Sequence, residues 1–132
     1  MRTKCAVVVA GIALLVSVIG VSAHHSFSAE FDASKPFKMT GTVTKVEWMN
    51  PHTFFYIDVP DEKTGKVTNW AMEMGSPNGL MRAGWTRNTM KVGDVVAVEG
   101  SLARSGRALG NARTVILTST GQRLFAASSA TP

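Results

Sequence analysis

The sequence predicts a small all-β domain, a five-stranded β-barrel with one helix between the third and fourth strands. Three observations lead to this fold class. Short segments of alternating apolar and polar residues are separated by turn residues, which is typical of strands. A single helix start, Ser76-Pro77, follows the third such segment. Of the 132 residues, 109 remain once a 23-residue leader is subtracted, which is enough for one domain.

The first strand is expected from about Met39 to Met49, and it should be long and bent. Val43 belongs to one phase of the apolar alternation, whereas Val46 and Trp48 belong to the other. A change of phase within one strand indicates a bulge. Pro51 has no N–H and ends the run.

The second and third strands are expected to form a hairpin. Thr53 to Val59 alternates Phe55 and Ile57 against Phe54 and Tyr56. The polar run 61–66 is typical of a hairpin turn, and Val67 to Met74 then continues the alternation.

The helix is expected over residues 77–85, because serine is a good N-cap and proline is tolerated at the first helical position. The last strands are predicted over 95–102 and 112–118, joined by a loop over 104–111, and 121–125 adds a short pairing segment. We expect Phe55, Ile57, Val98 and Val115 in the core. This order of elements is that of an OB-fold, a Greek-key barrel, and the helix argues against sandwiches and SH3-like barrels.

The first residues have the pattern of an export signal. A basic start is followed by an apolar run from Cys5 to Val21 and by small residues up to Ala23. The pattern predicts a signal peptide over 1–23 and a periplasmic or secreted protein. Cleavage after Ser22 and a retained membrane anchor are the alternatives, although the apolar run is short for the roughly 20 residues of a spanning helix. Cys5 is the only cysteine in the sequence, so a protein without the leader has no disulfide bonds within its chain.

The rest of the chain is divided by composition. We expect a flexible arm over 24–38, the OB-fold-like domain over 39–125 and a disordered tail over 126–132. Removing the leader lowers Lys plus Arg from 14 to 12 against 9 acids, a net charge of +3. The basic residues are scattered, so we expect no nucleic-acid partner.

Several short motifs resemble a family of small exported bacterial proteins that is known only as a domain of unknown function. The resemblance covers nearly the whole chain after the leader, and implies export and one small β-rich domain, but no established activity. The motifs that carry it are His24-His25-Ser26-Phe27, Glu47-Trp48-Met49-Asn50-Pro51-His52, Asn69-Trp70, Gly75-Ser76-Pro77-Asn78, Gly84-Trp85-Thr86-Arg87 and Gly93-Asp94-Val95-Val96.

The three histidines of the chain suggest a copper site. Cleavage after Ala23 leaves His24 with a free α-amine beside its imidazole, and His52 lies in a loop that binds ligands in OB-folds. One amine and two imidazole nitrogens suit Cu(II), an arrangement that resembles a histidine brace. Cleavage after Ser22 instead puts His25 third, which also allows a square-planar copper site. The sequence thus predicts metal ligands at His24, His25 and His52.

Methionines and one carboxylate are weaker candidates. Met49 precedes His52 by three residues and could add a thioether ligand for Cu(I). Met72 and Met74 share one face of the third strand, where core packing is the simpler interpretation. Glu73, in the opposite phase, is a candidate carboxylate at the rim of the barrel or a solvent-facing residue.

No motif of a hydrolase, metalloprotease or phosphate-binding enzyme is present in the sequence, so we do not expect an enzyme, although an oxidative copper enzyme stays open. The alternative to copper binding is a metal-free interaction module that binds a peptide, glycan or envelope partner. Phe54 and Tyr56 on the second strand, or one exposed tryptophan, are the candidate contacts for such a partner. The sequence leaves the oligomeric state open.

Overall fold

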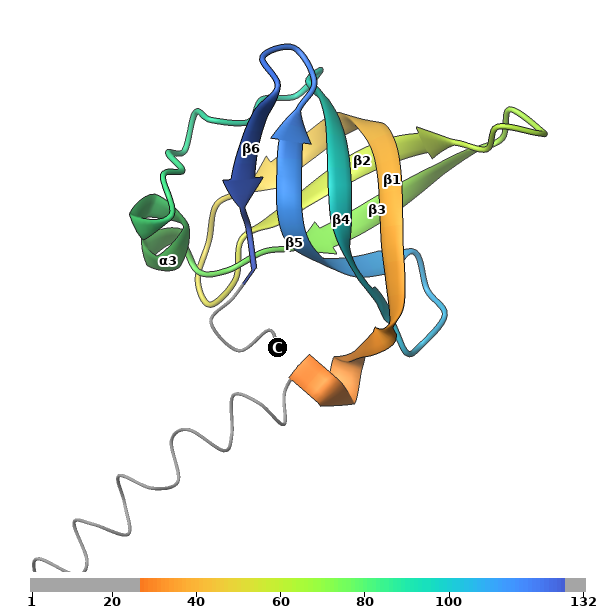
Figure 1. Ribbon diagram of the computed structural model, residues 1–132, viewed down its shortest axis with the longest axis horizontal. Helices are drawn as coiled ribbons and strands as arrows, with labels where there is room; N and C mark the ends of the chain where they lie inside the picture. Colours follow the sequence, from red (N-terminus) through yellow and green to blue (C-terminus); the bar gives the residue numbers. More distant parts are fainter. Residues whose placement is uncertain (1–26, 128–132) are drawn as a thin grey trace, which may run out of the picture.

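The computed structural model describes residues 27–127 and consists mainly of one antiparallel sheet that closes on itself (Figure 1). The strand order is β3-β2-β1-β4-β5-β6, and a parallel pairing of β3 with β5 joins β1 to β5 into a ring. The all-β class is confirmed, and this ring has the connectivity of the predicted Greek-key barrel. The elements are β1 (Phe31–Glu47), β2 (Phe54–Pro60), β3 (Val67–Glu73), α3 (Pro77–Arg82), β4 (Val95–Ala103), β5 (Leu109–Leu117) and β6 (Gln122–Phe125).

Strand β1 is long and bent, as predicted, and belongs to both sides of the ring. Its first part pairs with β4 and its last part with β2. The register with β2 shifts between Val43 and Lys45, where the apolar phase changes in the sequence. A Cβ at Gly41 would lie 2.6 Å from the Asp58 carbonyl oxygen, so only glycine allows this close approach of β2.

The expectation of a flexible arm over 24–38 is wrong for residues 31–38. Strand β1 starts at Phe31 rather than near Met39, and residues 27–30 form a helical turn before it. Phe31 and Phe37 provide the apolar contacts of this segment. The residues between them are polar or small and include Pro36, which hides the strand in the sequence. The register with β4 is irregular between Phe31 and Pro36. The predicted signal peptide, His24 and His25 lie outside the described residues.

The helix follows its sequence signals and ends early. The Gly79 N–H donates to the Ser76 side-chain oxygen (3.2 Å), and Pro77 occupies the first turn. The helix stops at Arg82 rather than residue 85, and Gly84 at φ +96° turns the chain away. No helix within residues 27–127 is long and apolar enough to cross a membrane.

The main core fills the barrel. Phe55, Ile57, Val98 and Val115, the four residues expected there, are fully buried. The predicted tail from residue 126 is wrong at its start, because Ala126 is buried and its N–H donates to the Arg113 carbonyl. Residues 128–132 lie outside the described part.

A second, smaller cluster lies outside the barrel. It consists of Phe27, Phe31, Ala103 and Leu109, and it packs against Phe54 and Ala71. We call this set the N-terminal cluster. It brings the helical turn at residues 27–30 against the strands at the lower end of the barrel in Figure 1.

Candidate functional site

His52 lies in the loop between β1 and β2, and backbone hydrogen bonds tie this loop to the end of β3. The Thr53 N–H donates to the Gly75 carbonyl (3.0 Å), and the Met74 N–H donates to the Thr53 carbonyl (2.8 Å). These two bonds continue the β2–β3 ladder beyond the last strand residues. The sheet therefore fixes the backbone next to His52.

The imidazole of His52 has a defined tautomer. Its Nδ1 lies 3.1 Å from the Met74 carbonyl oxygen. A carbonyl oxygen only accepts hydrogen bonds, so Nδ1 carries the proton and donates it. In the neutral ring the lone pair is then on Nε2. The side chain is 36% exposed, and Nε2 is the atom through which His52 can bind a metal ion.

A carboxylate stands beside this imidazole. The Oε1 atom of Glu73 is 3.7 Å from His52 Nδ1, although the Glu73 side chain is only 12% exposed. Burial raises the pKa of the Glu73 carboxyl and nearby Glu30 raises it further, whereas the neighbouring side chains of His52 and Asn111 lower it. The structure thus joins two residues that the sequence singled out separately, His52 and Glu73.

The N-terminal cluster fixes the chain close to this pair. Phe27 is 7% exposed, and its ring centroid lies 5.6 Å from that of Phe31. The cluster packs against Phe54, which is the Cα partner of Glu73 across β2 and β3. Directly opposed residues in neighbouring strands share one face of the sheet. The chain at residue 27 therefore packs on the face that carries Glu73.

Arg104 also holds the segment at residues 28–32 in place. Its Nε–H donates to the Ser28 carbonyl (2.7 Å), and its backbone N–H donates to the Glu30 carbonyl (2.8 Å). Its guanidinium also lies 3.5 Å from the Asp32 carboxylate. Three contacts from one residue hold residues 28–32 against the end of β4.

The methionine candidates separate into two groups. Met72 and Met74 are fully buried in the barrel, which confirms core packing. Met49 is 49% exposed in the loop before His52. Within residues 27–127, no three His, Cys, Asp or Glu side chains are arranged to hold a metal ion.

The two aromatic residues expected to contact a partner are engaged within the chain. Phe54 packs against the N-terminal cluster. The Tyr56 hydroxyl donates to Glu47 (2.9 Å), and Lys45 lies 5.3 Å from the centre of the Tyr56 ring. These contacts leave neither ring as an open stacking surface.

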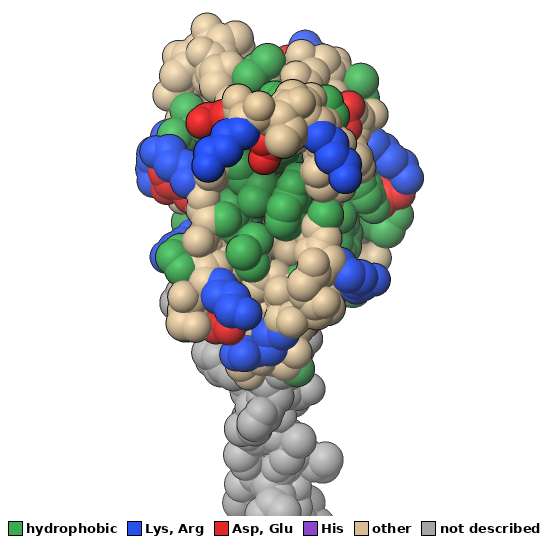
Figure 2. All heavy atoms as spheres, turned by 90° about the vertical axis from the view of Figure 1, so that its right-hand side faces the viewer, with side chains coloured by type: hydrophobic (Ala, Val, Ile, Leu, Met, Phe, Trp, Pro, Cys, Tyr) green, Lys and Arg blue, Asp and Glu red, His purple; other side chains and the backbone are tan. Residues whose placement is uncertain are grey.

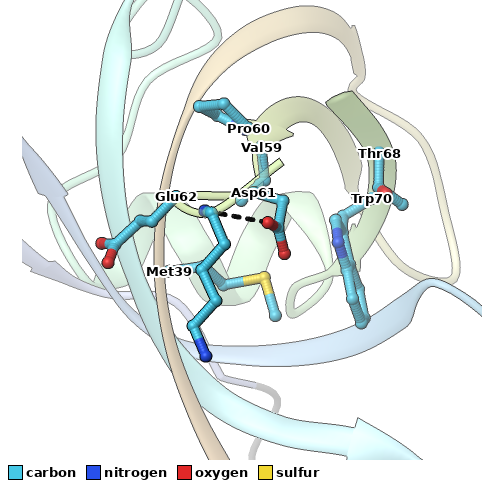
Figure 3. A pocket seen from close by; sticks show the side chains of 8 residues that line it. Met39, Val59, Pro60, Asp61, Glu62, Thr68 and Trp70 are labelled. Carbon is cyan, nitrogen blue, oxygen red and sulfur yellow. Dashed lines mark hydrogen bonds between the residues drawn. The ribbon is translucent and has the colours of Figure 1, made fainter. Parts of the chain in front are cut away.

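A separate hollow lies beside the β2–β3 hairpin. Figure 2 shows that this side of the molecule has a hydrophobic middle with Lys, Arg, Asp and Glu side chains around it. The hollow has a volume of about 540 Å³, and Met39 and Trp70 flank it (Figure 3). The Asp61 carboxylate at its rim accepts hydrogen bonds from the N–H groups of Lys63 and Thr64 within the hairpin turn.

This arrangement can be compared with known proteins. The chain belongs to a family of unknown function, DUF6152, whose model matches residues 13–112. The match agrees with the resemblance seen in the short motifs. No curated protein matches the chain significantly.

The sequence did not single out Asn111, and it marked Arg104 only as one of a group of late arginines, because both residues were expected in the loop 104–111. In the structure, β5 already begins at Leu109, and Asn111 pairs with Glu73 across the β3–β5 contact. Asn111 is only 1% exposed. The signal in the sequence was its position, because Asn111 directly precedes the alternating run that was predicted as a strand from Ala112.

Proposed function

We propose that the protein is exported as a small periplasmic or secreted binding protein, and that it binds Cu(II) through His52 and the amino terminus at His24. The observation that carries this proposal is the state of His52. Its Nδ1–H is committed to the Met74 carbonyl, so Nε2 is left as a donor on a half-exposed ring. Protein copper and zinc sites use neutral histidines oriented in this way.

The position of residue 27 supports the amino terminus as the second part of the site. His24 precedes Phe27 by three residues, and three residues span at most about 11 Å. Phe27 is held in the cluster that packs on Phe54, two residues after His52. This placement of Phe27 supports the proposal that the α-amine and imidazole of His24 approach His52.

The charge near His52 also favours a cation. Glu30 and Glu73 lie close enough for their charges to repel, and the ion pair of Glu73 among the described residues is with His52. A divalent cation next to His52 would offset this negative charge.

Copper titration of the mature protein tests the proposal. The parent starting at His24 should bind one Cu(II) per chain, with affinity measured by competition against a chelator of known affinity. His52→Ala and a form with one extra residue before His24 should both lose tight binding. Intact mass confirms each terminus.

His52→Gln is the matched control for the fold, because a glutamine amide can still donate to the Met74 carbonyl. It should unfold at the parent's temperature and still bind copper weakly. If His52→Ala and the parent bind Cu(II) equally well, the amino terminus acts alone and the shared site is wrong.

The hollow beside the hairpin favours a second candidate, a metal-free module that binds a glycan or peptide. Trp70 flanks this hollow with Met39 and Val59, and an indole ring offers an apolar face for stacking. Titration with short oligosaccharides or peptides, followed by tryptophan fluorescence, tests this function. A response in the parent that persists in Trp70→Phe would place the ligand elsewhere.

A further inference from the structure

The first half of β3 has a free edge. This strand pairs with β2 over Val67–Glu73, but it pairs with β5 only from Ala71 onward. The Ala71 N–H donates to the Ala108 carbonyl on the β5 side (3.0 Å). Alternate residues of a strand direct their N–H and C=O groups to the same edge, so Val67 and Asn69 direct theirs to this side as well. Within residues 27–127, no strand pairs with these groups.

The hollow beside the hairpin lies against the same part of β3. Its lining includes Thr68 and Trp70, which alternate with the two residues of the free edge. Met39 on β1 and Val59 on β2 add apolar wall, and Figure 3 shows Met39 and Trp70 on its two sides. A strand added beside β3 would direct every second side chain to the face that carries Trp70. The hollow, of about 540 Å³, has room for such side chains.

The charges beside the free edge favour an acidic partner. Lys66 directly precedes the first residue of β3, and Arg107 lies next to the carbonyl that begins the β3–β5 contact. Neither side chain has an ion pair in the part of the chain that the structure describes. At the hairpin turn the charges of Glu62 and Lys63 cancel, and the Asp61 carboxylate already accepts hydrogen bonds. A cation therefore stands at each end of the edge.

We propose that this edge and the hollow bind an extended, acidic peptide segment that adds to β3 as a further strand. This inference rests on the second candidate function, the metal-free binding module. The N–H and C=O groups of Val67 and Asn69 bond to the backbone of the segment. Its alternate apolar side chains enter the hollow against Trp70, and its carboxylates pair with Lys66 and Arg107. A glycan stacks on an aromatic ring but does not continue a ladder of backbone hydrogen bonds, so the free edge favours a polypeptide.

Selection from a library of random short peptides displayed on phage tests the class of partner. The mature protein is the target, and calorimetry measures the affinity of the selected peptides after synthesis. We expect selected peptides with apolar residues at alternate positions and a net negative charge. A selection that enriches no peptide, or only peptides without this alternation, would overturn the proposal.

Asn69→Pro and Asn69→Ala form a matched pair that tests strand addition. Both remove the side-chain amide, which donates to Thr44 and Asp58, but only proline removes the N–H at the free edge. Proline is accepted where a strand N–H faces solvent, so the two variants should unfold at similar temperatures. A peptide carbonyl left without its donor should weaken binding about tenfold or more in Asn69→Pro relative to Asn69→Ala. Val67→Pro against Val67→Ala repeats the comparison at the other donor, whether or not Asn69→Pro folds.

The outcomes distinguish this inference from the function on which it rests. If Asn69→Pro and Asn69→Ala bind the selected peptides equally well, strand addition is wrong but the binding module stands. If only oligosaccharides give a response that depends on Trp70, the module stands and the peptide partner is wrong. If neither peptides nor oligosaccharides bind, both fail. Sedimentation that shows a dimer of the parent and a monomer of Asn69→Pro would assign the edge to a second copy of the chain, which would also overturn the proposal.

Discussion

Phe27 gives the sharpest test of how the N-terminal segment is held. The change Phe27→Ala removes a ring that is 7% exposed from the N-terminal cluster. A buried aromatic side chain removes about 150–250 Å² from water. At about 25 cal/mol per Å² this corresponds to about 4–6 kcal/mol, an upper value because unfolded chains are already partly compact.

The expected loss is smaller than this upper value. Phenylalanine-to-alanine changes in protein cores cost about 3–5 kcal/mol. The N-terminal cluster is small and close to the start of the described chain, so its neighbours can relax into the space. We therefore expect Phe27→Ala to lower the free energy of unfolding by about 3 kcal/mol.

Urea denaturation, followed by tryptophan fluorescence, measures this free energy. Phe125→Ala is the matched control, because its ring is 56% exposed and should contribute about 1 kcal/mol or less. Equal losses in the two variants would refute the anchoring of residue 27. If the anchor also positions His24, the Cu(II) affinity should fall in Phe27→Ala and stay unchanged in Phe125→Ala.

Four further changes test other parts of the structure. Ile57→Ala empties a fully buried position and should cost about 2–5 kcal/mol in urea denaturation. Gly100→Ala places a Cβ 1.9 Å from the Asn111 carbonyl oxygen, so circular dichroism should show a lower melting temperature. Thr53→Val replaces a buried hydroxyl that has no partner among the described residues and should raise stability by about 1 kcal/mol. Hydrogen bonds from Lys38 and Arg123 lower the pKa of Glu99 from its ordinary value of 4.5, so its contribution to stability is present above that value and is lost as the pH falls through the lowered pKa. Glu99→Gln should therefore flatten the decline of the melting temperature in acid.

The strands with regular alternation could be predicted closely from the sequence. Strands β2, β3 and β4 lie within one or two residues of their expected bounds, since each has one face in the barrel. The change of phase between Val43 and Val46 located the irregularity in β1. Ser76 marked the start of the helix because its side chain satisfies a free N–H there.

The start of β5 could not be predicted from the sequence, because this segment is covered on two sides. The first four residues of β5, from Leu109, are all buried, with the barrel on one face and the N-terminal cluster on the other. A segment buried on both faces loses its alternation, so the sequence predicted a loop as far as Asn111 and a strand only from Ala112. The sequence could not show that His52 lies beside Glu73, because this contact depends on how β2 and β3 align in space.

The position of Glu73 beside His52 depends on the short contact between β3 and β5. Only three residue pairs join these strands, and Glu73 with Asn111 is the last of them. Any partial opening along this seam would separate β3 from β5 and move Glu73 and the Met74 carbonyl, the two groups beside His52 Nδ1. A ligand that binds only the closed form stabilises it in proportion to the logarithm of its concentration. If the proposed Cu(II) site forms, copper binding should therefore slow hydrogen exchange at this seam.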